Sequence, residues 1–176
     1  MTTAPTLTTD RLVLRHHKRA DLPPLFDLLA SERSRYMDGP FTKRDIWLLI
    51  ASETGSWSLK GFGSWAITHG HTDECLGQIG LNQPAHFPEV ELGWMLVEKA
   101  EGKGFAFEAA KTVLNWAKAH LSLTSLVSYI DPQNKRSLAL AQKLGAEKDV
   151  SAPPPDGESK TTTWVLRHHL KRRKNP

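Results

Sequence analysis

The chain has very little cysteine and no long apolar run, and both shortages narrow the class of protein. Its 176 residues contain one cysteine, Cys75, which cannot form a disulfide within the chain. No stretch approaches the roughly 18 apolar residues of a membrane-spanning helix. The opening MTTAPTLTTD has neither the basic start nor the apolar centre of a secretory signal. We therefore expect a cytoplasmic protein in a reducing environment, with no membrane partner.

Several ligand-binding patterns are also missing. His69, His71 and Cys75 lie close together, but no second pair of ligands follows at the spacing of a metal site, so we expect no metal. There is no Cys–His nucleophile arrangement, which argues against a covalent acyl-enzyme. No internal repeat or dividing linker occurs. The chain is predicted to be a single domain over 1–176, with its core at about 9–170 and a basic tail at 171–176.

Positive charge is present in modest excess, with a formal net charge of +4. Part of it lies in the C-terminal RHHLKRRKNP, which is either a solvated, frayed end or a contact for nucleic acid or ribosomes. We favour the frayed end and do not expect nucleic acid as a partner. A basic surface also suits a polyanionic cofactor. The oligomeric state stays open between monomer and homodimer.

Hydrophobic periodicity predicts an α/β (α+β) domain with a mixed, mostly antiparallel sheet flanked by helices, in the order β-α-α-β-β-β-α-β-α-β-β. Strands are expected at 11–17, 63–70, 75–83, 90–97, 125–130 and 161–169. Helices are expected at 20–33, 42–53, 104–120 and 134–145. Asp21 and Thr42 are candidate N-caps, and Gly145 stands where a helix ends in a C′ glycine.

The early part of the chain is rich in tryptophan. Trp47, Trp57 and Trp65 either pack in the core or form walls of an acceptor site. The stretch ETGSWSLKGFG, residues 53–63, is interpreted as a mobile loop that covers the acceptor.

Two glycines stand two residues apart where an apolar strand gives way to a helix, in EGKGFA. The first turn of a helix has unpaired N–H groups at the positive end of its dipole, and phosphates bind there readily. Gly102 and Gly104 let the backbone approach an anion, and Lys103 adds charge. The third glycine of a dinucleotide-binding turn is missing, as is the Gly-Lys-Ser/Thr of a P-loop. The stretch is therefore a pyrophosphate cradle or a simple strand-to-helix turn.

A glutamate lies within the apolar strand that leads to these glycines. Strand alternation places Glu91 on one face with Gly93, Met95 and Val97, and its sequence neighbours are apolar. A carboxylate in such surroundings is partly desolvated, which raises its pKa toward the range of a useful general base. The other interpretation is a glutamate at a strand edge, paired or solvated.

Three stretches together resemble the GNAT N-acetyltransferases, and most closely the branch that acetylates the N-termini of ribosomal proteins. TDRLVLR is similar to the branch's opening strand, ELGWMLVEKAEGKGFAFEA to its acetyl-CoA motif, and NKRSLALAQKLG to its Asn-x-x-Ser helix. The resemblance covers about 9–167. It implies an acyltransferase that moves an acetyl group from the cosubstrate acetyl-CoA to a primary amine, on a protein N-terminus or a small molecule.

The resemblance also assigns residues to the cofactor. Backbone groups of Met95, Leu96 and Val97 would pair with the pantetheine arm like an added strand. Asn134 would contact the cofactor near the pantetheine. The CoA pyrophosphate would be held by the amides of Gly102, Lys103, Gly104, Phe105 and Ala106.

Catalytic roles follow from the same resemblance. Glu91 would accept a proton through water, a backbone amide near Met95 or Leu96 would polarise the thioester carbonyl, and Ser137 would protonate the leaving thiolate. The alternative for Ser137 is a helix serine bonded to its own backbone. The chain departs from the family at Glu101, an anion near the phosphates, and at Ala141, where many relatives have a tyrosine acid.

Three functions compete at this stage. The first is an acetyl-CoA-dependent N-acetyltransferase. The second is a non-catalytic acyl-CoA-binding module, and the third is a nucleic-acid-associated protein that uses the basic tail. Turnover with an amine separates the first from the second, and steeply salt-dependent binding would identify the third.

Overall fold

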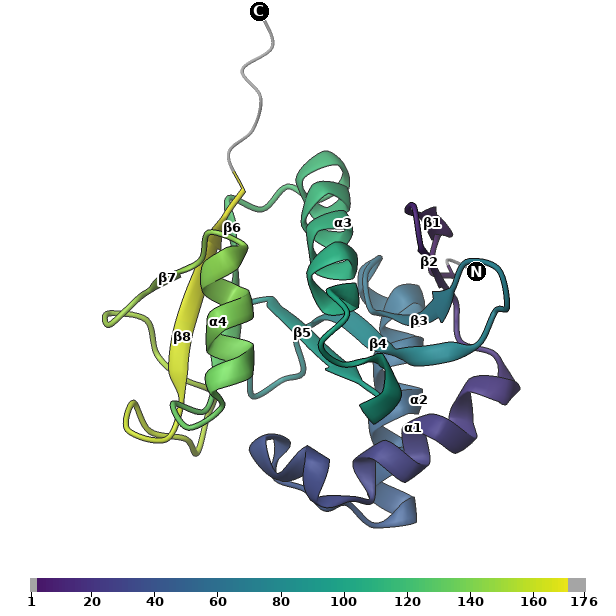
Figure 1. The fold of residues 1–176 in the computed structure, drawn as a ribbon. Coiled ribbons are helices and arrows are strands. Elements are labelled where there is room, and N and C mark those ends of the chain that lie inside the picture. Colours follow the sequence, from purple (N-terminus) through teal and green to yellow (C-terminus); the bar gives the residue numbers. More distant parts are fainter. Residues whose placement is uncertain (1–2, 171–176) are drawn as a thin grey trace, which may run out of the picture.

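The computed structural model describes residues 3–170, which form an eight-stranded sheet with helices packed against it (Figure 1). The strands are β1 (Leu7–Thr8), β2 (Leu12–Arg15), β3 (Ser64–His69), β4 (Cys75–Asn82), β5 (Glu91–Leu96), β6 (Ser125–Ile130), β7 (Glu147–Lys148) and β8 (Trp164–His169). The helices are α1 (Leu22–Leu29), α2 (Lys43–Lys60), α3 (Phe105–His120) and α4 (Lys135–Lys143), with 3-10 helices η1 (Arg19–Asp21), η2 (Glu32–Met37) and η3 (Glu98–Ala100). The expected basic tail at 171–176 lies outside the described residues.

The strand order across the sheet is β1-β2-β3-β4-β5-β6-β8-β7. Every neighbouring pair is antiparallel except β5 and β6, which are parallel and joined through α3. The predicted mixed, mostly antiparallel sheet is therefore confirmed.

The sheet opens between β5 and β6. These strands pair at one position, Glu91 with Val127. A further link is the Ser128 hydroxyl, which donates to the Leu92 carbonyl oxygen at 2.7 Å. Beyond that point the described residues of β5 have no strand neighbour on the β6 side, and Figure 1 shows the two strands diverging. A run of β5 backbone without a strand partner on one side is thus left in the middle of the fold.

The two faces of the sheet are covered by different helices. Alternation along β4 turns Ile79 and Leu81 toward α3, where they join the main apolar core. A second core lies on the opposite face, where α1 and α2 pack over Cys75 and Met95. The alternate β4 residues Gln78, Gly80 and Asn82 face a cavity on this second side.

The expected mobile loop at 53–63 is wrong, because α2 continues through it to Lys60 and ends at Gly61 in a left-handed conformation, φ 75°. Gly55 and several serines lower the helix propensity of this stretch. Tertiary packing overrides that weakness: Trp57 is 1% exposed, and its indole N–H donates to the Ser64 carbonyl oxygen at 3.0 Å.

Of the two interpretations of the early tryptophans, core packing holds for Trp57 and Trp65. Trp57 and Trp65 are buried, with ring centroids 4.6 Å apart, and both pack edge-on against Trp116 of α3. Trp47 is 56% exposed on the outer side of α2. The alternative interpretation, core packing, is confirmed for Trp57 and Trp65.

The predicted helix ends are only partly correct. The Thr42 hydroxyl accepts from the Asp45 backbone N–H and caps α2 as expected. Gly145 follows α4 with φ 85°, also as expected. Asp21 precedes α1, but its side chain makes no cap. Its carboxylate instead accepts from the Arg15 guanidinium at 2.7 and 2.9 Å, because a buried arginine needs an ionic partner.

Candidate active site

A cavity of about 370 Å³ lies on the side of the sheet covered by α1 and α2, at the opening between β5 and β6. Strands β4, β5 and β6 supply its floor, and η2, the mouth of α3 and the start of α4 supply its walls. It brings together seven of the residues that the sequence singled out: Glu91, Met95, Leu96, Gly102, Ala106, Asn134 and Ser137.

The free edge of β5 forms one wall. Met95 and Leu96 both line the cavity at the level where β6 has diverged. Val97 differs, because its N–H donates to the Leu76 carbonyl oxygen and its own carbonyl oxygen accepts from Ala100, both at 2.9 Å. The available backbone therefore comes from Met95 and Leu96.

The mouth of α3 is a turn that only glycine adopts easily. Gly102 and Gly104 have φ values of 71° and 80°, in the left-handed region where other side chains are strained. Among the described residues, no backbone N–H from 102 to 107 finds a backbone partner. These N–H groups are the unpaired donors of a helix start, and Gly102 and Ala106 place them beside the cavity.

Three of the predicted cradle residues do not line the cavity. Phe105 is buried in the main core, with the Arg11 guanidinium 4.7 Å above its ring. The Lys103 carbonyl oxygen accepts from Arg11 at 2.9 Å, and Gly104 lies next to the same guanidinium. Lys103, Gly104 and Phe105 thus shape the turn, and their backbone N–H groups remain available to an anion, as does the exposed side chain of Lys103.

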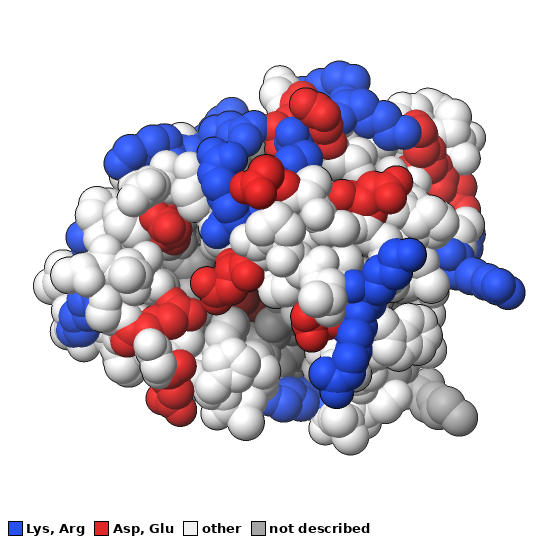
Figure 2. Space-filling view, turned by 90° about the horizontal axis from the view of Figure 1, so that it is seen from below, with Lys and Arg blue, Asp and Glu red and all other residues white. Residues whose placement is uncertain are grey.

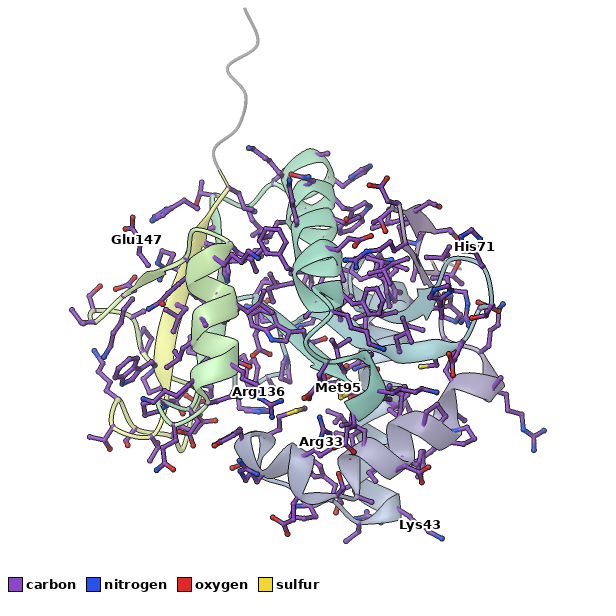
Figure 3. The ribbon with its side chains drawn as sticks, viewed as in Figure 1. Arg33, Lys43, His71, Met95, Arg136 and Glu147 are labelled. Atoms are coloured by element: carbon purple, nitrogen blue, oxygen red, sulfur yellow. The ribbon has the colours of Figure 1, made fainter. Side chains whose placement is uncertain are left out.

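Glu101 holds two arginines at the rim of the cavity. Its carboxylate forms ion pairs with Arg33 of η2 and with Arg136 of α4. Figure 3 shows these two arginines reaching the same region beside Met95 from opposite sides. We call this group the Glu101 clasp. It places two guanidinium groups next to the unpaired amides of the α3 mouth.

Asn134 and Ser137 stand at the start of α4. The Asn134 side-chain oxygen accepts from the Ser137 backbone N–H at 3.2 Å, so Asn134 is the N-cap. The Ser137 hydroxyl has no hydrogen bond to any described residue, which removes the alternative that it bonds its own backbone. Ala141, one turn later, is fully buried and offers no acid.

Glu91 lies at the point where β5 and β6 separate. It pairs with Asn82 across β4 and with Val127 across β6. Burial raises its pKa to about 8, and the negative charge of Glu53 adds to the effect. Its carboxyl group therefore titrates close to the neutral range, where a general base is useful.

Glu53 is a second carboxylate in the cavity that the sequence reasoning missed. Its oxygens accept from the Ser64 hydroxyl at 2.6 Å, from the Asn82 amide at 3.3 Å and from the Gln78 amide. Burial raises its pKa to about 7, although the hydrogen bonds from Ser64 and Gln78 act in the opposite direction.

A signal for Glu53 was present in the sequence. Ile46, Ile50 and Trp57 make an apolar stripe at helical spacing, and Glu53 occupies the remaining position on it. A carboxylate on the buried face of a helix requires polar partners, and this pattern indicates a functional group once α2 is known to extend past 53.

Two glycines leave room for this polar group. Gly80 and Gly93 face each other across β4 and β5. A Cβ at Gly80 would lie 2.2 Å from the Ser64 hydroxyl, so a side chain there would disrupt the bond to Glu53. A Cβ at Gly93 would lie 3.3 Å from the nearer Glu91 oxygen. The floor of the cavity is therefore kept bare beside both carboxylates.

Other reactive groups are unsuited to the chemistry. Burial raises the pKa of the Cys75 thiol to about 11, which disfavours a nucleophilic thiolate. Within residues 3–170, no three His, Cys, Asp or Glu side chains are grouped to hold a metal ion. No helix among these residues is long and apolar enough to span a membrane.

The opening between β5 and β6, the α3 mouth and the two buried carboxylates are compatible with acyl transfer, and the comparisons identify the class. Residues 11–147 match the family model of the acetyltransferase (GNAT) domain, and the chain belongs to that family. GNAT acetyltransferases take their acyl group from acetyl-CoA, and the suspected family is confirmed.

Two relatives are similar over most of their length. An acetyltransferase of Agrobacterium tumefaciens strain C58, known from its crystal structure, is 41% identical, with a TM-score of 0.89 and 96% of each chain covered. The protein YkkB of Bacillus subtilis strain 168 is 32% identical over 148 residues, which cover 79% of this chain and 83% of YkkB.

The expected ribosomal branch is not distinguished by these comparisons. The ribosomal L7/L12 alpha-N-protein acetyltransferase RimL, solved in complex with coenzyme A, has a TM-score of 0.74 but only 14% identity, over 94% of this chain and 98% of RimL. At that identity the likeness shows a shared fold, and the branch stays a prediction.

Proposed function

We propose that this acyltransferase transfers the acetyl group of acetyl-CoA to a primary amine by direct attack. The observation that carries the proposal is one cavity that joins the free edge of β5, the unpaired amides of the α3 mouth and the Glu91 carboxylate. The α3 mouth suits a pyrophosphate, and the edge of β5 suits an extended amide-bearing arm.

The residues divide the reaction between them. Glu91 takes the first proton from the ammonium group through water, and the free amine attacks the thioester carbonyl carbon. A Met95 or Leu96 amide stabilises the oxyanion. The C–S bond then breaks, the Ser137 hydroxyl delivers a proton to the thiolate, and the second amine proton replaces it. The products are an N-acetyl amide, free CoA and one released proton.

Three finer features belong to the same proposal. The amides from Gly102 to Ala106 hold the CoA pyrophosphate, and Asn134 contacts the pantetheine arm from the start of α4. The whole chain acts as one acetyltransferase domain in the cytoplasm. Either a protein N-terminus or a small-molecule amine fits the chemistry so far described.

A thermal melt tests the cofactor assignment. A ligand present at about 100 times its Kd stabilises a protein by ~2.7 kcal/mol, which for a domain of this length raises Tm by roughly 5–10 °C. We expect that shift with acetyl-CoA and with CoA, and none with NAD. No shift at millimolar acetyl-CoA would contradict the proposal, because the cavity would then not bind the donor.

The Glu101 clasp gives a second prediction. Replacing Glu101 by glutamine removes an anion beside the phosphate site and frees Arg33 and Arg136 to face the ligand. We expect acetyl-CoA to bind about three- to tenfold more tightly, since one nearby unit charge contributes on the order of 1 kcal/mol at an exposed site. Isothermal titration at two salt concentrations measures the change.

Glu98→Gln is the matched control for the clasp. The Glu98 side chain is 83% exposed, and its Oε1 lies 3.4 Å from a guanidinium nitrogen of Arg33. The Glu98→Gln substitution therefore removes the same charge from the rim without freeing Arg136. Weaker binding of acetyl-CoA by the Glu101→Gln variant would show that the carboxylate orients the two arginines for the ligand. The expected repulsion between Glu101 and the phosphates would then be wrong.

A further inference from the structure

The cavity beside Glu91 offers hydrogen-bond acceptors in excess. Glu53 and Glu91 each bring a carboxylate, and neither forms an ion pair with any lysine, arginine or histidine of residues 3–170. Asn82 lies near both: its amide donates to Glu53, and its amide nitrogen and a Glu91 oxygen both lie within 4 Å of the position that a Cβ of residue 93 would take.

Gln78 supplies an independent observation in the same place. Its side chain lines the cavity and the residue is 5% exposed. Its amide nitrogen donates to the Glu53 carboxylate, which fixes the orientation of the amide. The amide oxygen is buried and has no hydrogen-bond partner among the described residues. A buried acceptor without a donor is unfavourable, so this oxygen points to a ligand that carries N–H groups.

The reacting amine alone does not satisfy these groups. It must lose its charge to attack the thioester, and Glu91 is the group placed to take that proton. The Glu53 carboxylate and the Gln78 oxygen then still lack a cationic donor. A protonated amine carries up to three N–H donors and one positive charge, which matches both.

We propose, on the basis of the function proposed above, that the acceptor is a diamine or polyamine whose second, protonated amino group is bound by Glu53 and the Gln78 amide oxygen. The distribution of charge along the cavity supports this proposal. The clasp arginines lie at the end where the CoA phosphates bind, and the carboxylates lie at the acceptor end. Figure 2 shows acidic side chains beside a hollow on this face, with basic side chains distributed around it.

The test compares two acceptors that differ by one charge. We would measure kcat and KM for CoA thiol release with 1,4-diaminobutane and with n-butylamine. A second pair is 1,3-diaminopropane and n-propylamine, and spermidine is tested as a polyamine. The wild-type protein is expected to prefer the diamines by about tenfold or more in kcat/KM, because a hydrogen-bonded charge at a buried site is discriminated to at least that extent. The preference should arise mainly in KM.

Glu53→Gln removes the charge and keeps the shape. We expect about a tenfold or larger rise in KM with the diamine and not with n-butylamine, while any change in kcat is shared by both amines because the Glu53 charge also raises the pKa of Glu91. Gln78→Met removes the unpaired oxygen and should reduce the same preference, which keeps the test valid if Glu53→Gln folds poorly. The control is Glu147→Gln, since Glu147 is exposed on β7, far from the cavity (Figure 3). It should leave both substrates unaffected.

The outcomes separate this inference from the function on which it rests. Turnover of n-butylamine or a peptide N-terminus that equals or exceeds turnover of the diamines would overturn the diamine proposal and leave the acetyltransferase function standing. Equal losses by Glu53→Gln with both amines would also overturn it. A Tm shift with acetyl-CoA but no CoA release with any amine would contradict the proposed function itself.

Discussion

Glu91→Gln is expected to lower kcat/KM for amine acetylation at pH 7 by about 100-fold or more, the usual contribution of a general base. The amide keeps the size of the side chain but cannot accept the proton of the ammonium group. The loss should be larger for an alkylamine or lysine-like acceptor, with a pKa of about 10.4, than for an α-amine, with a pKa of about 7.7–8.0. The second kind is already partly unprotonated.

The pH profile identifies the base. Burial raises the pKa of Glu91 to about 8, so the carboxyl group is mostly protonated, and inactive as a base, below that pH. Wild-type kcat/KM with an alkylamine should therefore rise up to about pH 8 and then level off. The Glu91→Gln variant should keep rising toward the pKa of the amine, because it depends on free amine from solution. Equal losses at every pH from 7 to 9 would show that Glu91 is not the base.

The thermal stability of the Glu91→Gln variant is the control for this experiment. A glutamate whose pKa is raised in the folded state binds its proton more tightly there, so its contribution to stability falls as pH rises from its ordinary pKa toward 8. Glutamine does not ionise. The variant should consequently melt at the same temperature as the wild type at pH 5 and at an equal or higher one at pH 8. A lower Tm at pH 8 would mean that the lost activity reflects unfolding.

Trp57→Ala is expected to cost about 3–5 kcal/mol of folding free energy, the range for deleting a fully buried aromatic side chain. Trp57 is 1% exposed and lies between two other rings, with centroid distances of 4.6 Å to Trp65 and 5.5 Å to Trp116. Its N–H bond to the Ser64 carbonyl oxygen would also be lost. Tm should fall by roughly 6–20 °C, at ~2–4 °C per kcal/mol for a domain of this length.

Trp47→Ala is the matched control, because it removes the same side chain from the same helix where it is 56% exposed. Its free energy of unfolding should change by no more than about 0.5 kcal/mol. Urea denaturation measures both variants. A Trp57→Ala loss as small as that of Trp47→Ala would show that the three-tryptophan cluster does not hold the end of α2 against the sheet.

The sequence predicted the parts of the fold whose signal is local. Strands β2 to β6, β8 and helices α3 and α4 follow directly from residue periodicity, and Gly145 marks the end of α4. The end of α2 could not be predicted this way, because Gly55 and its serine neighbours favour a loop and only the buried Trp57 ring reverses that preference. Because the predicted helix ends at Glu53 itself, the apolar stripe that continues to Trp57 could not place Glu53 on a buried face.

The candidate site shows the same division. Glu91 and Gly102 belong to one short stretch, and their placement around a common cavity agrees with the sequence-based hypothesis. The clasp joins Glu101 to Arg33 and Arg136, which come from three separate elements. No local pattern marks such a contact. The pairing of Gln78 with Glu53 likewise depends on how α2 crosses β4.

The narrow junction of the sheet has a mechanical consequence. Because β5 and β6 pair only at Glu91 and Val127, the sheet consists of two halves, β1 to β5 and β6 to β8, with few bonds between them. The chain connects the two halves through α3. A molecule bound at the opening between β5 and β6 would contact both halves of the sheet and hold them together. Local opening in proteins follows the places with the fewest interior bonds. Acetyl-CoA bound at this opening, as proposed above, would therefore make the whole sheet more rigid.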